Sequence, residues 1–310
     1  MAAVPPGLGG DAVPAVPDPS ATVTEIDGRR LRLTHLDRVY YPETGWTKAA
    51  VLQYYLKAAP LLLPHLAGRP ASFLRLPEGV AGERFWAKRV PPGAPDWLTT
   101  LEVEHRAETL RHVVVADLPT LLWAANLGAL EIHVPQWRHD PEEHDRLIVD
   151  LDPGPGTTIV DCCTVALLAR RELAADGLTA WPKTSGGKGL HLLVPLRPVP
   201  ERAATDYARR LAARLRAHRP DLVVDRMDRS LRDGRVFVDW SQNSSAKTTA
   251  APYSLRAGPT PAVSVPFTWT AVRNCRSPED LRLTPEQVLA RPRDPMAGLT
   301  DPGKAGELPG

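Results

Sequence analysis

The order of strand-like and helix-like segments leaves few architectures open to this chain. In the first half, strand-like runs recur at residues 71–76, 84–89, 98–104, 110–115 and 129–135. In the second half, strands are expected at 147–152, 179–184, 189–195 and 235–240, with helices at about 157–175 and 201–218. Because strands and helices do not alternate regularly, we predict an α+β fold with mixed, largely antiparallel sheets flanked by helices.

Local signals near the start of the chain support further elements. Residues 23–33 alternate around Asp27-Gly28 as a hairpin does, and a helix over 48–63 follows Thr47 as its N-cap. We expect a disordered N-terminal tail at 1–21, a folded domain at 22–296 and a flexible C-terminal tail at 297–310, because periodic apolar residues are missing from both ends. One large domain or two closely fused lobes are both compatible with 310 residues.

Charge and cysteine content narrow the class of protein. The formal net charge is only +2, but residues 200–219 hold six arginines, which predicts a local basic face. The cysteines, Cys162, Cys163 and Cys275, cannot form a structural zinc site by themselves, which fits a reducing cytoplasmic compartment. We expect neither export nor membrane insertion, because the sequence has no apolar leader and no stretch of about 18 apolar residues.

Two aspartates one residue apart end the apolar run before Pro153-Gly154. Side chains alternate along a strand, so Asp150 and Asp152 point to the same side, roughly 7 Å apart, where they repel each other unless a positive charge lies between them. Asp239 ends a later apolar run. Three converging carboxylates would suit Mg²⁺ or Mn²⁺, and two such ions about 3.5–4 Å apart stabilise phosphoryl transfer.

Each of these features also has a purely structural interpretation. Asp152 suits a turn cap, and Asp239 suits a strand-end ion pair with an arginine. The turn 185–189 offers backbone N–H groups and Lys188 to a phosphate, but a Gly-rich hairpin turn is the simpler explanation, and it is not a Walker A loop. His191 is typical of a core histidine. The sequence does not show that the aspartates meet.

Taken together and in order, several motifs resemble the polymerase domain of bacterial ligase D, the end-joining branch of the archaeo-eukaryotic primase superfamily. The motifs are D-L-D-P-G (150–154), T-S-G-G-K-G-L-H (184–191) and F-V-D-W-S-Q-N (237–243), with L-D-R-V-Y-Y-P-E-T-G-W-T-K (36–48), L-E-I-H-V-P-Q-W-R (130–138) and K-T-T-A-A-P-Y-S-L-R (247–256). The resemblance covers nearly all of 30–290 and implies a primase-polymerase-like catalytic core.

The resemblance implies roles for particular residues. Asp150, Asp152 and Asp239 would be catalytic and bind two divalent metal ions, Mn²⁺ or Mg²⁺. The nucleoside triphosphate would be held by Ser185, Lys188 and His191, with His133 and Ser185 near the 2′-hydroxyl and Arg232, Gln242 and Arg256 as further contacts. A preference for ribonucleotides is implied as well.

The family's DNA-binding residues also have counterparts. Arg38 and Lys48 match two basic residues that hold the 5′-phosphate of a broken end; arginine replaces the usual lysine at 38, which keeps the charge and adds bidentate bonding. A solvated surface pair is the alternative. Trp86 matches an aromatic that stacks on a template base, although a strand aromatic is otherwise usually core. Leu74 stands where some relatives carry a basic residue, which puts part of the template or phosphate contact in question.

These implications lead to one main functional hypothesis and two alternatives. We expect a template-directed nucleotidyltransferase, associated with the nucleoid, that fills gaps and extends 3′ ends at double-strand breaks. A separate DNA ligase and the Ku end-binding protein are the expected partners, since the chain carries neither a K-x-D-G ligase signature nor a phosphoesterase module. The alternatives are a primase that starts strands de novo and a non-catalytic scaffold that binds DNA ends.

Overall fold

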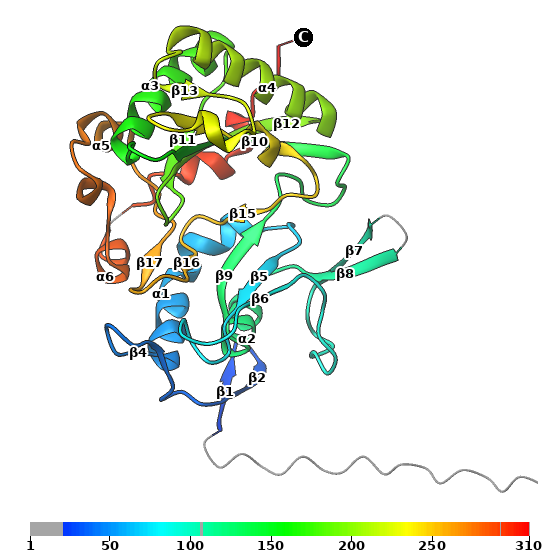
Figure 1. Ribbon diagram of the computed structural model, residues 1–310. Coiled ribbons are helices and arrows are strands. Elements are labelled where there is room, and N and C mark those ends of the chain that lie inside the picture. Colours follow the sequence, from blue (N-terminus) through cyan, green and yellow to red (C-terminus); the bar gives the residue numbers. More distant parts are fainter. Residues whose placement is uncertain (1–20, 106–107, 292, 310) are drawn as a thin grey trace, which may run out of the picture.

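A five-stranded sheet forms the centre of one of two lobes in the computed structural model, which describes residues 21–105, 108–291 and 293–309 (Figure 1). Its strands, in spatial order, are β11 (Trp181–Thr184), β12 (Leu190–Pro200), β10 (Glu143–Pro153), β14 (Val236–Val238) and β13 (Val223–Val224). All neighbours are antiparallel except β13 and β14. The long central strand β10 therefore brings β12 and β14 to its two sides.

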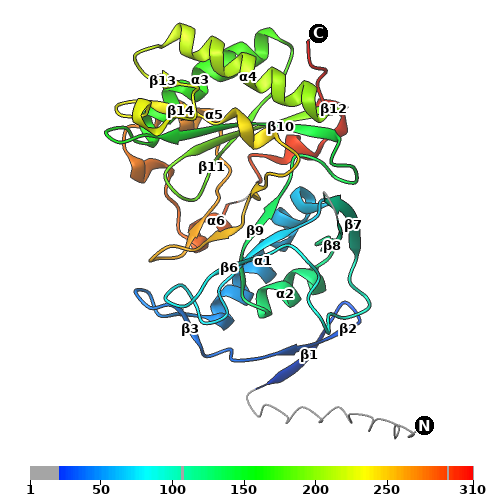
Figure 2. The same cartoon turned by 45° about the vertical axis from the view of Figure 1, so that its right-hand side comes forward.

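Two helices, α3 (Ile159–Ala175) and α4 (Glu201–His218), cover the outer face of this sheet (Figures 1 and 2). Thr158 and Asp161 form a capping box that begins α3. The buried residues of α4 recur at helical spacing, as Ala204, Tyr207, Ala208, Leu211, Ala212 and Leu215. Leu151 lies on the helix-covered face, where its carbonyl oxygen accepts from Cys162. Because strand side chains alternate, Ile148, Asp150 and Asp152 face the other lobe.

A four-stranded sheet lies in the second lobe. Its strands, in spatial order, are β15 (Thr249–Ala250), β9 (Ala129–Val134), β5 (Ser72–Arg75) and β6 (Phe85–Ala87). Helices α1 (Lys48–Leu66) and α2 (Leu118–Asn126) pack in the same lobe, and the hydroxyl of Tyr55 on α1 donates to the carbonyl of Leu130 on β9 at 2.7 Å. The hydroxyl of Thr47 accepts from Ala50 N, which confirms the predicted N-cap.

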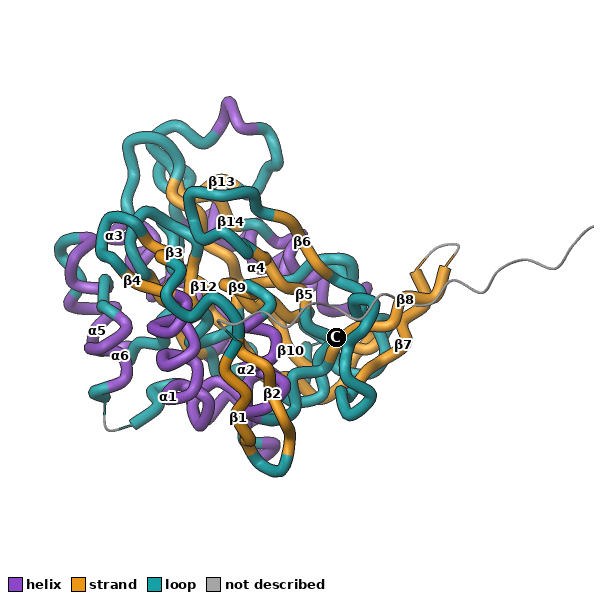
Figure 3. Tube along the Cα trace, turned by 90° about the horizontal axis from the view of Figure 1, so that it is seen from below, coloured by secondary structure: helices purple, strands orange, loops and turns teal. Residues whose placement is uncertain are grey.

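Short hairpins and turns complete the described chain. The remaining strands form the pairs β1 (Thr22–Ile26) with β2 (Arg29–Leu33), β3 (Val39–Tyr41) with β4 (Trp46–Thr47), β7 (Thr100–His105) with β8 (Glu108–Val113), and β16 (Leu255–Arg256) with β17 (Ala262–Val263). The short helices are α5 (Trp269–Asn274), α6 (Pro285–Leu289), η1 (Arg229–Leu231), η2 (Trp240–Asn243), η3 (Pro278–Leu281), η4 (Ala297–Thr300) and η5 (Pro302–Lys304). The hairpins β1–β2 and β7–β8 lie at the periphery (Figure 3).

The predicted fold class and most predicted elements are confirmed. Asp27 and Gly28 both have positive φ, 47° and 73°, which is the geometry of a tight hairpin turn between β1 and β2. Helix α2 was not predicted, and its start is defined by Asp117, whose side chain accepts from Thr120 N. Cys162, Cys163 and Cys275 are buried and free. Within the described residues, no helix is both long and apolar enough to cross a membrane.

The C-terminal segment differs from the flexible tail expected at 297–310. Leu299 is buried and packs with Ile148, Leu193 and Met296. Gly306 extends the contact, since its N–H donates to Pro195 O at 3.0 Å and its carbonyl accepts from Arg197 N at 2.9 Å. Residues 297–309 are therefore held by apolar burial and backbone hydrogen bonds, neither of which has a periodic signal in the sequence. The tail expected at 1–21 falls almost entirely outside the described residues.

Candidate active site

Three aspartates meet at one end of the five-stranded sheet. Asp150 and Asp152 lie on β10, and Asp239 directly follows β14, which pairs with β10 through Leu151↔Val238. The backbone N–H of Asp239 donates to the carbonyl of Asp150 at 2.9 Å. The antiparallel pairing of two strands about ninety residues apart therefore assembles the carboxylates that the sequence left separate.

Burial and mutual repulsion raise the pKa values of two of these carboxylates. Burial, and then the negative charge of Asp239, raise the pKa of Asp150 to about 7. Burial, followed by the charges of Asp150 and Asp239, also raises the pKa of Asp152 to about 7. A site that makes two carboxylates difficult to ionise favours any cation that neutralises them.

The donor set fits divalent metal ions, although the three side chains are not yet arranged around one. Oδ1 of Asp150 is buried and accepts no hydrogen bond from the described residues, although Nε2 of His191 lies 3.2 Å away. All three groups offer the oxygen ligands that Mg²⁺ and Mn²⁺ prefer. In the described parts of the chain, no three Asp, Glu, His or Cys side chains lie close enough to hold one ion. The carboxylate of Asp239 instead accepts from Ser241 N and Oγ and from Gln242 Nε2. Asp239 must exchange some of these bonds to join a metal site.

The Gly-rich turn after β11 is organised by Ser185. Its Oγ accepts from Gly187 N at 3.2 Å and from Gly189 N at 3.1 Å, so these two N–H groups are not free as we expected. A serine hydroxyl at a turn competes for backbone donors in this way. The Ser185 hydroxyl proton can still be donated, and Lys188 is exposed at the turn. The turn therefore presents one cation and one hydroxyl rather than a full nest of amides.

His191, which follows this turn, lies between an aspartate and a buried lysine. It pairs across the strands with Asp150 on one side and Lys183 on the other. Nζ of Lys183 donates to Nδ1 of His191 at 2.9 Å, which leaves the ring proton on Nε2, 3.2 Å from Oδ1 of Asp150. Burial, followed by the charge of Lys183, holds the pKa of His191 well below its usual range. His191 is thus a neutral, oriented side chain at the edge of the carboxylate site.

The second lobe contributes a cluster around a buried carboxylate, Glu131. Its Oε2 lies 2.7 Å from Nε2 of His133 and 2.9 Å from Nη1 of Arg256. Burial acts to raise the pKa of Glu131, but the hydrogen bond from His133 and the charge of Arg256 hold it below its usual value. The Trp86 ring, 52% exposed, meets His133 edge-on with centroids 4.8 Å apart. Trp86 is therefore available at the surface, while His133 is buried.

Arg256 also lies against the Gly-rich turn. A Cβ at Gly186 would come within 2.4 Å of Cγ of Arg256, so only glycine allows this approach. Arg232, on the other side of the site, stacks on Phe237, with its Cζ 3.7 Å from the ring centroid. Burial and the neighbouring carboxylates raise the pKa of Asp152, and the charge of Arg232 offsets part of that rise. Arg232 and Arg256 thus lie near the carboxylates from two sides.

Arg38 and Lys48 form a separate basic pair on the second lobe. The backbone N–H of Lys48 donates to the carbonyl of Arg38. Nη1 of Arg38 binds Glu78 at 2.5 Å, and Nζ of Lys48 donates to the carbonyl of Thr34 at 2.7 Å. Burial, and then the charge of Arg38, lower the pKa of Lys48 to about 8. An added anion would relieve this repulsion, but it must compete with Glu78.

Two observations change how the sequence is interpreted. Leu74, on β5, is buried and packs in the hydrophobic core. Glu131 and Lys183 had no role in the sequence analysis, yet each orients a predicted site residue. The sequence did contain a signal for Glu131: Glu131 and His133 are two positions apart on one strand, so their side chains lie on the same face.

Comparison with known proteins agrees with this architecture. A model of the LigD primase-polymerase domain matches residues 47–296. The multifunctional non-homologous end joining protein LigD of Mycolicibacterium smegmatis is 44% identical over 266 residues, covering 84% of this chain and 34% of that protein. The bifunctional non-homologous end joining protein LigD of Bacillus subtilis is 29% identical over 252 residues, covering 80% and 40%. The polymerase domain from Mycobacterium tuberculosis ligase D in complex with DNA superposes with a TM-score of 0.83 at 43% identity, covering 88% of this chain and 99% of that one.

The fold and the comparisons define a domain of the primase-polymerase type. The chain belongs to the LigD primase-polymerase domain family. It spans about a third of the length of the mycobacterial relatives.

Proposed function

We propose that this chain is a template-directed nucleotidyltransferase that fills gaps and extends 3′ ends at double-strand breaks in non-homologous end joining. The observation that carries the proposal is the convergence of Asp150, Asp152 and Asp239 at one sheet edge, with pKa values of about 7 for the first two. A bound cation would relieve this repulsion. The similarity to a ligase D polymerase domain in complex with DNA supports the same substrate class.

The metal ions would be held by Asp150, Asp152 and Asp239. When bound, two ions, Mn²⁺ or Mg²⁺, supply positive charge to the attacking and leaving oxygens of phosphoryl transfer. Little acid–base chemistry is then asked of the protein, and positioning of the reactants provides much of the rate.

The nucleotide would lie between the Gly-rich turn and the second lobe. Lys188 is exposed at the turn, and Arg256 reaches the same turn from β16, so both can pair with a triphosphate. His191 is oriented by Lys183 and can donate from Nε2. Ser185 and His133 would contact the sugar, and this pair underlies the proposed preference for ribonucleotides. Arg232 and Gln242 complete the proposed contacts, Gln242 after releasing Asp239.

DNA would be held mainly by the second lobe. Trp86 is half exposed on β6 and can stack on a template base, a contact worth about 1–3 kcal/mol per base. Arg38 and Lys48 would bind the 5′-phosphate of the downstream strand. A DNA ligase and a Ku end-binding protein would seal and present the ends, with the protein acting at the nucleoid.

One assay tests the proposal directly. A gapped duplex with a labelled 3′ end is incubated with Mn²⁺ or Mg²⁺ and either ribo- or deoxynucleotides, with and without a downstream 5′-phosphate. We expect template-dependent addition that is stimulated by the phosphate and faster with ribonucleotides. Synthesis on unprimed single strands at a comparable rate would instead assign a primase, and no addition with either metal would leave only a DNA-binding role.

A further inference from the structure

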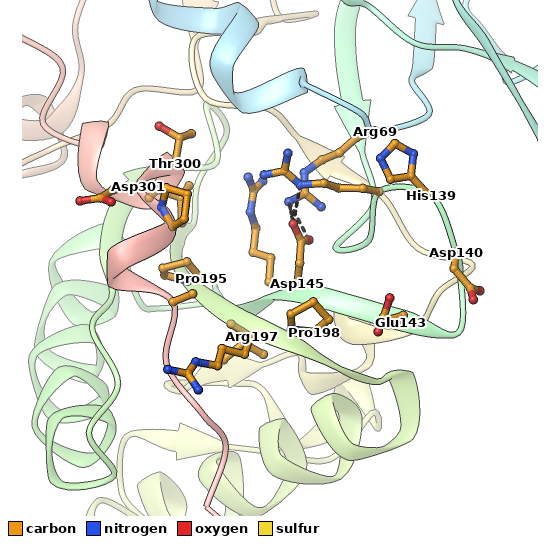
Figure 4. Close-up of a pocket in the computed structure, with 16 residues that line it drawn as sticks. Arg69, His139, Asp140, Glu143, Asp145, Pro195, Arg197, Pro198, Thr300 and Asp301 are labelled. Carbon is orange, nitrogen blue, oxygen red and sulfur yellow. Dashed lines mark hydrogen bonds and ion pairs between the residues drawn. The ribbon is translucent and has the colours of Figure 1, made fainter.

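An arginine-lined cavity lies between the lobes, apart from the carboxylate site. Its volume is about 480 Å³, within the usual range for small-molecule sites. It is bounded by the end of α1, the β9–β10 connection, β12 and the C-terminal segment, and Figure 4 shows the side chains that line it. The packed residues Ile148, Leu193, Met296 and Leu299 lie on β10, β12 and the C-terminal segment beyond it. Leu299 of this cluster lines the cavity, whereas Asp150 does not and lies four residues along β10 from the cavity residue Arg146.

A break in strand pairing creates the cavity wall. Arg146 pairs with Pro195, but His144 pairs with Val199, so three residues of β12 have no partner on β10. These are Leu196, Arg197 and Pro198, and all of them line the cavity. Leu196 instead bridges to Gly306 of the C-terminal segment. Bulges of this kind commonly re-aim side chains at functional sites.

The floor of the cavity carries more positive than negative charge. Arg69 and Arg138 both donate to Oδ2 of Asp145, at 2.8 and 2.6 Å, as the dashed lines in Figure 4 show. Arg146 is only 3% exposed and has no hydrogen-bond or ion-pair partner among the described residues. Arg69 and Arg138 thus share one carboxylate while Arg146 has none of its own, which leaves a net charge of +2 on these four side chains.

The other acidic groups do not neutralise this floor. The carboxylate of Asp301 accepts from Gly303 N, and that of Asp140 accepts from Glu142 N, so both are engaged in turns. In Figure 4 the two side chains point away from the Arg69–Asp145 pair. Glu143 is exposed at the rim. Leaving a buried guanidinium without a counter-charge costs free energy that a bound anion would recover.

We propose that this cavity is a binding site for a phosphate group, held by Arg146 together with Arg69 and Arg138. A phosphate dianion matches the uncompensated charge, and the planar guanidinium can bind two of its oxygens at once. The apolar wall of Pro195, Leu196 and Leu299 leaves room for more than the phosphate itself. The phosphate can belong to a free anion, such as pyrophosphate, or to the end of a polynucleotide.

Calorimetric titration of the whole chain tests the site and its source of phosphate. Inorganic phosphate, pyrophosphate and a short 5′-phosphorylated oligonucleotide are titrated separately, without divalent metal. We expect Kd for the bound species to rise at least tenfold in Arg146→Met, because a charge-assisted pair is lost. An effect on the oligonucleotide as well as on the inorganic anions identifies a polynucleotide end; an effect on the inorganic anions alone identifies a free anion.

Three further variants keep the result interpretable. Arg138 is 40% exposed, so Arg138→Met should fold even if Arg146→Met does not, and we expect about a fivefold weaker affinity. Lys57→Met removes an exposed cation on α1 that does not line the cavity, and it should change Kd by less than about twofold. Lys188→Ala removes the cation of the proposed nucleotide site, so it distinguishes binding there from binding in the cavity. Absence of binding up to about 10 mM, or loss in Lys188→Ala with Arg138→Met unaffected, would overturn the proposal.

Discussion

The backbone N–H of Asp239 donates to the carbonyl oxygen of Asp150 at 2.9 Å, which joins two of the three clustered aspartates through main chain alone. The backbone positions of Asp150 and Asp239 are therefore set by the pairing of β10 with β14 and not by their side chains. Changing a side chain should consequently remove its charge and leave the geometry of the edge intact.

The first prediction follows for Asp150→Asn. Nucleotide addition should fall at least about a thousandfold if Asp150 is a metal ligand. Without metal, the variant should be more stable than the wild type at pH 8, by about 1–3 kcal/mol in the free energy of unfolding. The sign follows from the pKa of about 7 in the folded state, which lies above the usual aspartate value. The wild type loses stability as pH rises toward and through 7, and the variant loses less.

Melting curves in chelator at pH 5 and pH 8, with extension assays alongside, check both parts. Asp233→Asn, at an exposed position beyond η1, is the matched control and should change neither quantity. Extension by Asp150→Asn at near wild-type rates would remove Asp150 from the metal site.

The second prediction concerns Ser185, whose hydroxyl accepts from two turn amides and, in the proposed function, contacts the sugar. Ser185→Ala should narrow the preference for ribonucleotides by about 2- to 10-fold, since a hydrogen bond to a hydroxyl is worth about 0.5–1.5 kcal/mol. It should also raise KM for both sugars, because Gly187 and Gly189 lose their acceptor. Ser185→Thr keeps the oxygen and should retain the preference. Equal use of both sugars by the unmodified protein would rule out Ser185 as a sugar-selective contact.

The third prediction is a pH dependence of DNA binding that comes from Lys48. The pKa of Lys48 is about 8 in the free protein, because it is buried near Arg38, and a bound phosphate should raise it. Binding then takes up a proton near pH 8, so affinity for a 5′-phosphorylated gap should weaken between pH 7 and pH 9. Affinity for the same DNA with a 5′-hydroxyl should change much less.

Titration of the two DNAs at fixed salt measures this difference. Replacing Arg38 and Lys48 together with alanine should abolish it, whereas Lys57→Ala, on the outer face of α1, should not. Identical affinities of the wild type for both DNAs at pH 7 would argue for priming rather than end joining.

The fourth prediction tests the order of the C-terminal segment. Leu299→Ala should lower the free energy of unfolding by about 2–3 kcal/mol, because it removes a buried side chain from contact with Ile148 and Leu193. Met227→Ala is the control, since Met227 is 45% exposed and should cost little. Denaturant unfolding measures both. A cost below about 0.5 kcal/mol for Leu299→Ala would mean that the segment is not held there.

Short-range patterns in the sequence determined the elements and the direction of their side chains. Thr47 predicts the start of α1, and Asp27-Gly28 predicts the first hairpin, because caps and tight turns depend on a few neighbouring residues. The two-residue spacing of Asp150 and Asp152 places both on one face for the same reason. The ordered motifs also indicated the family before any fold was known.

Only the tertiary structure decided which of these residues meet. Asp239 joins Asp150 because β14 pairs with β10, and Glu131 holds Arg256 across 125 positions of sequence. Leu299 is ordered because the sheet leaves an apolar surface for it, although the residues around it show no periodicity. Such contacts depend on the packing of whole strands and lobes, where burial supplies the free energy, and a local pattern cannot encode its distant partner.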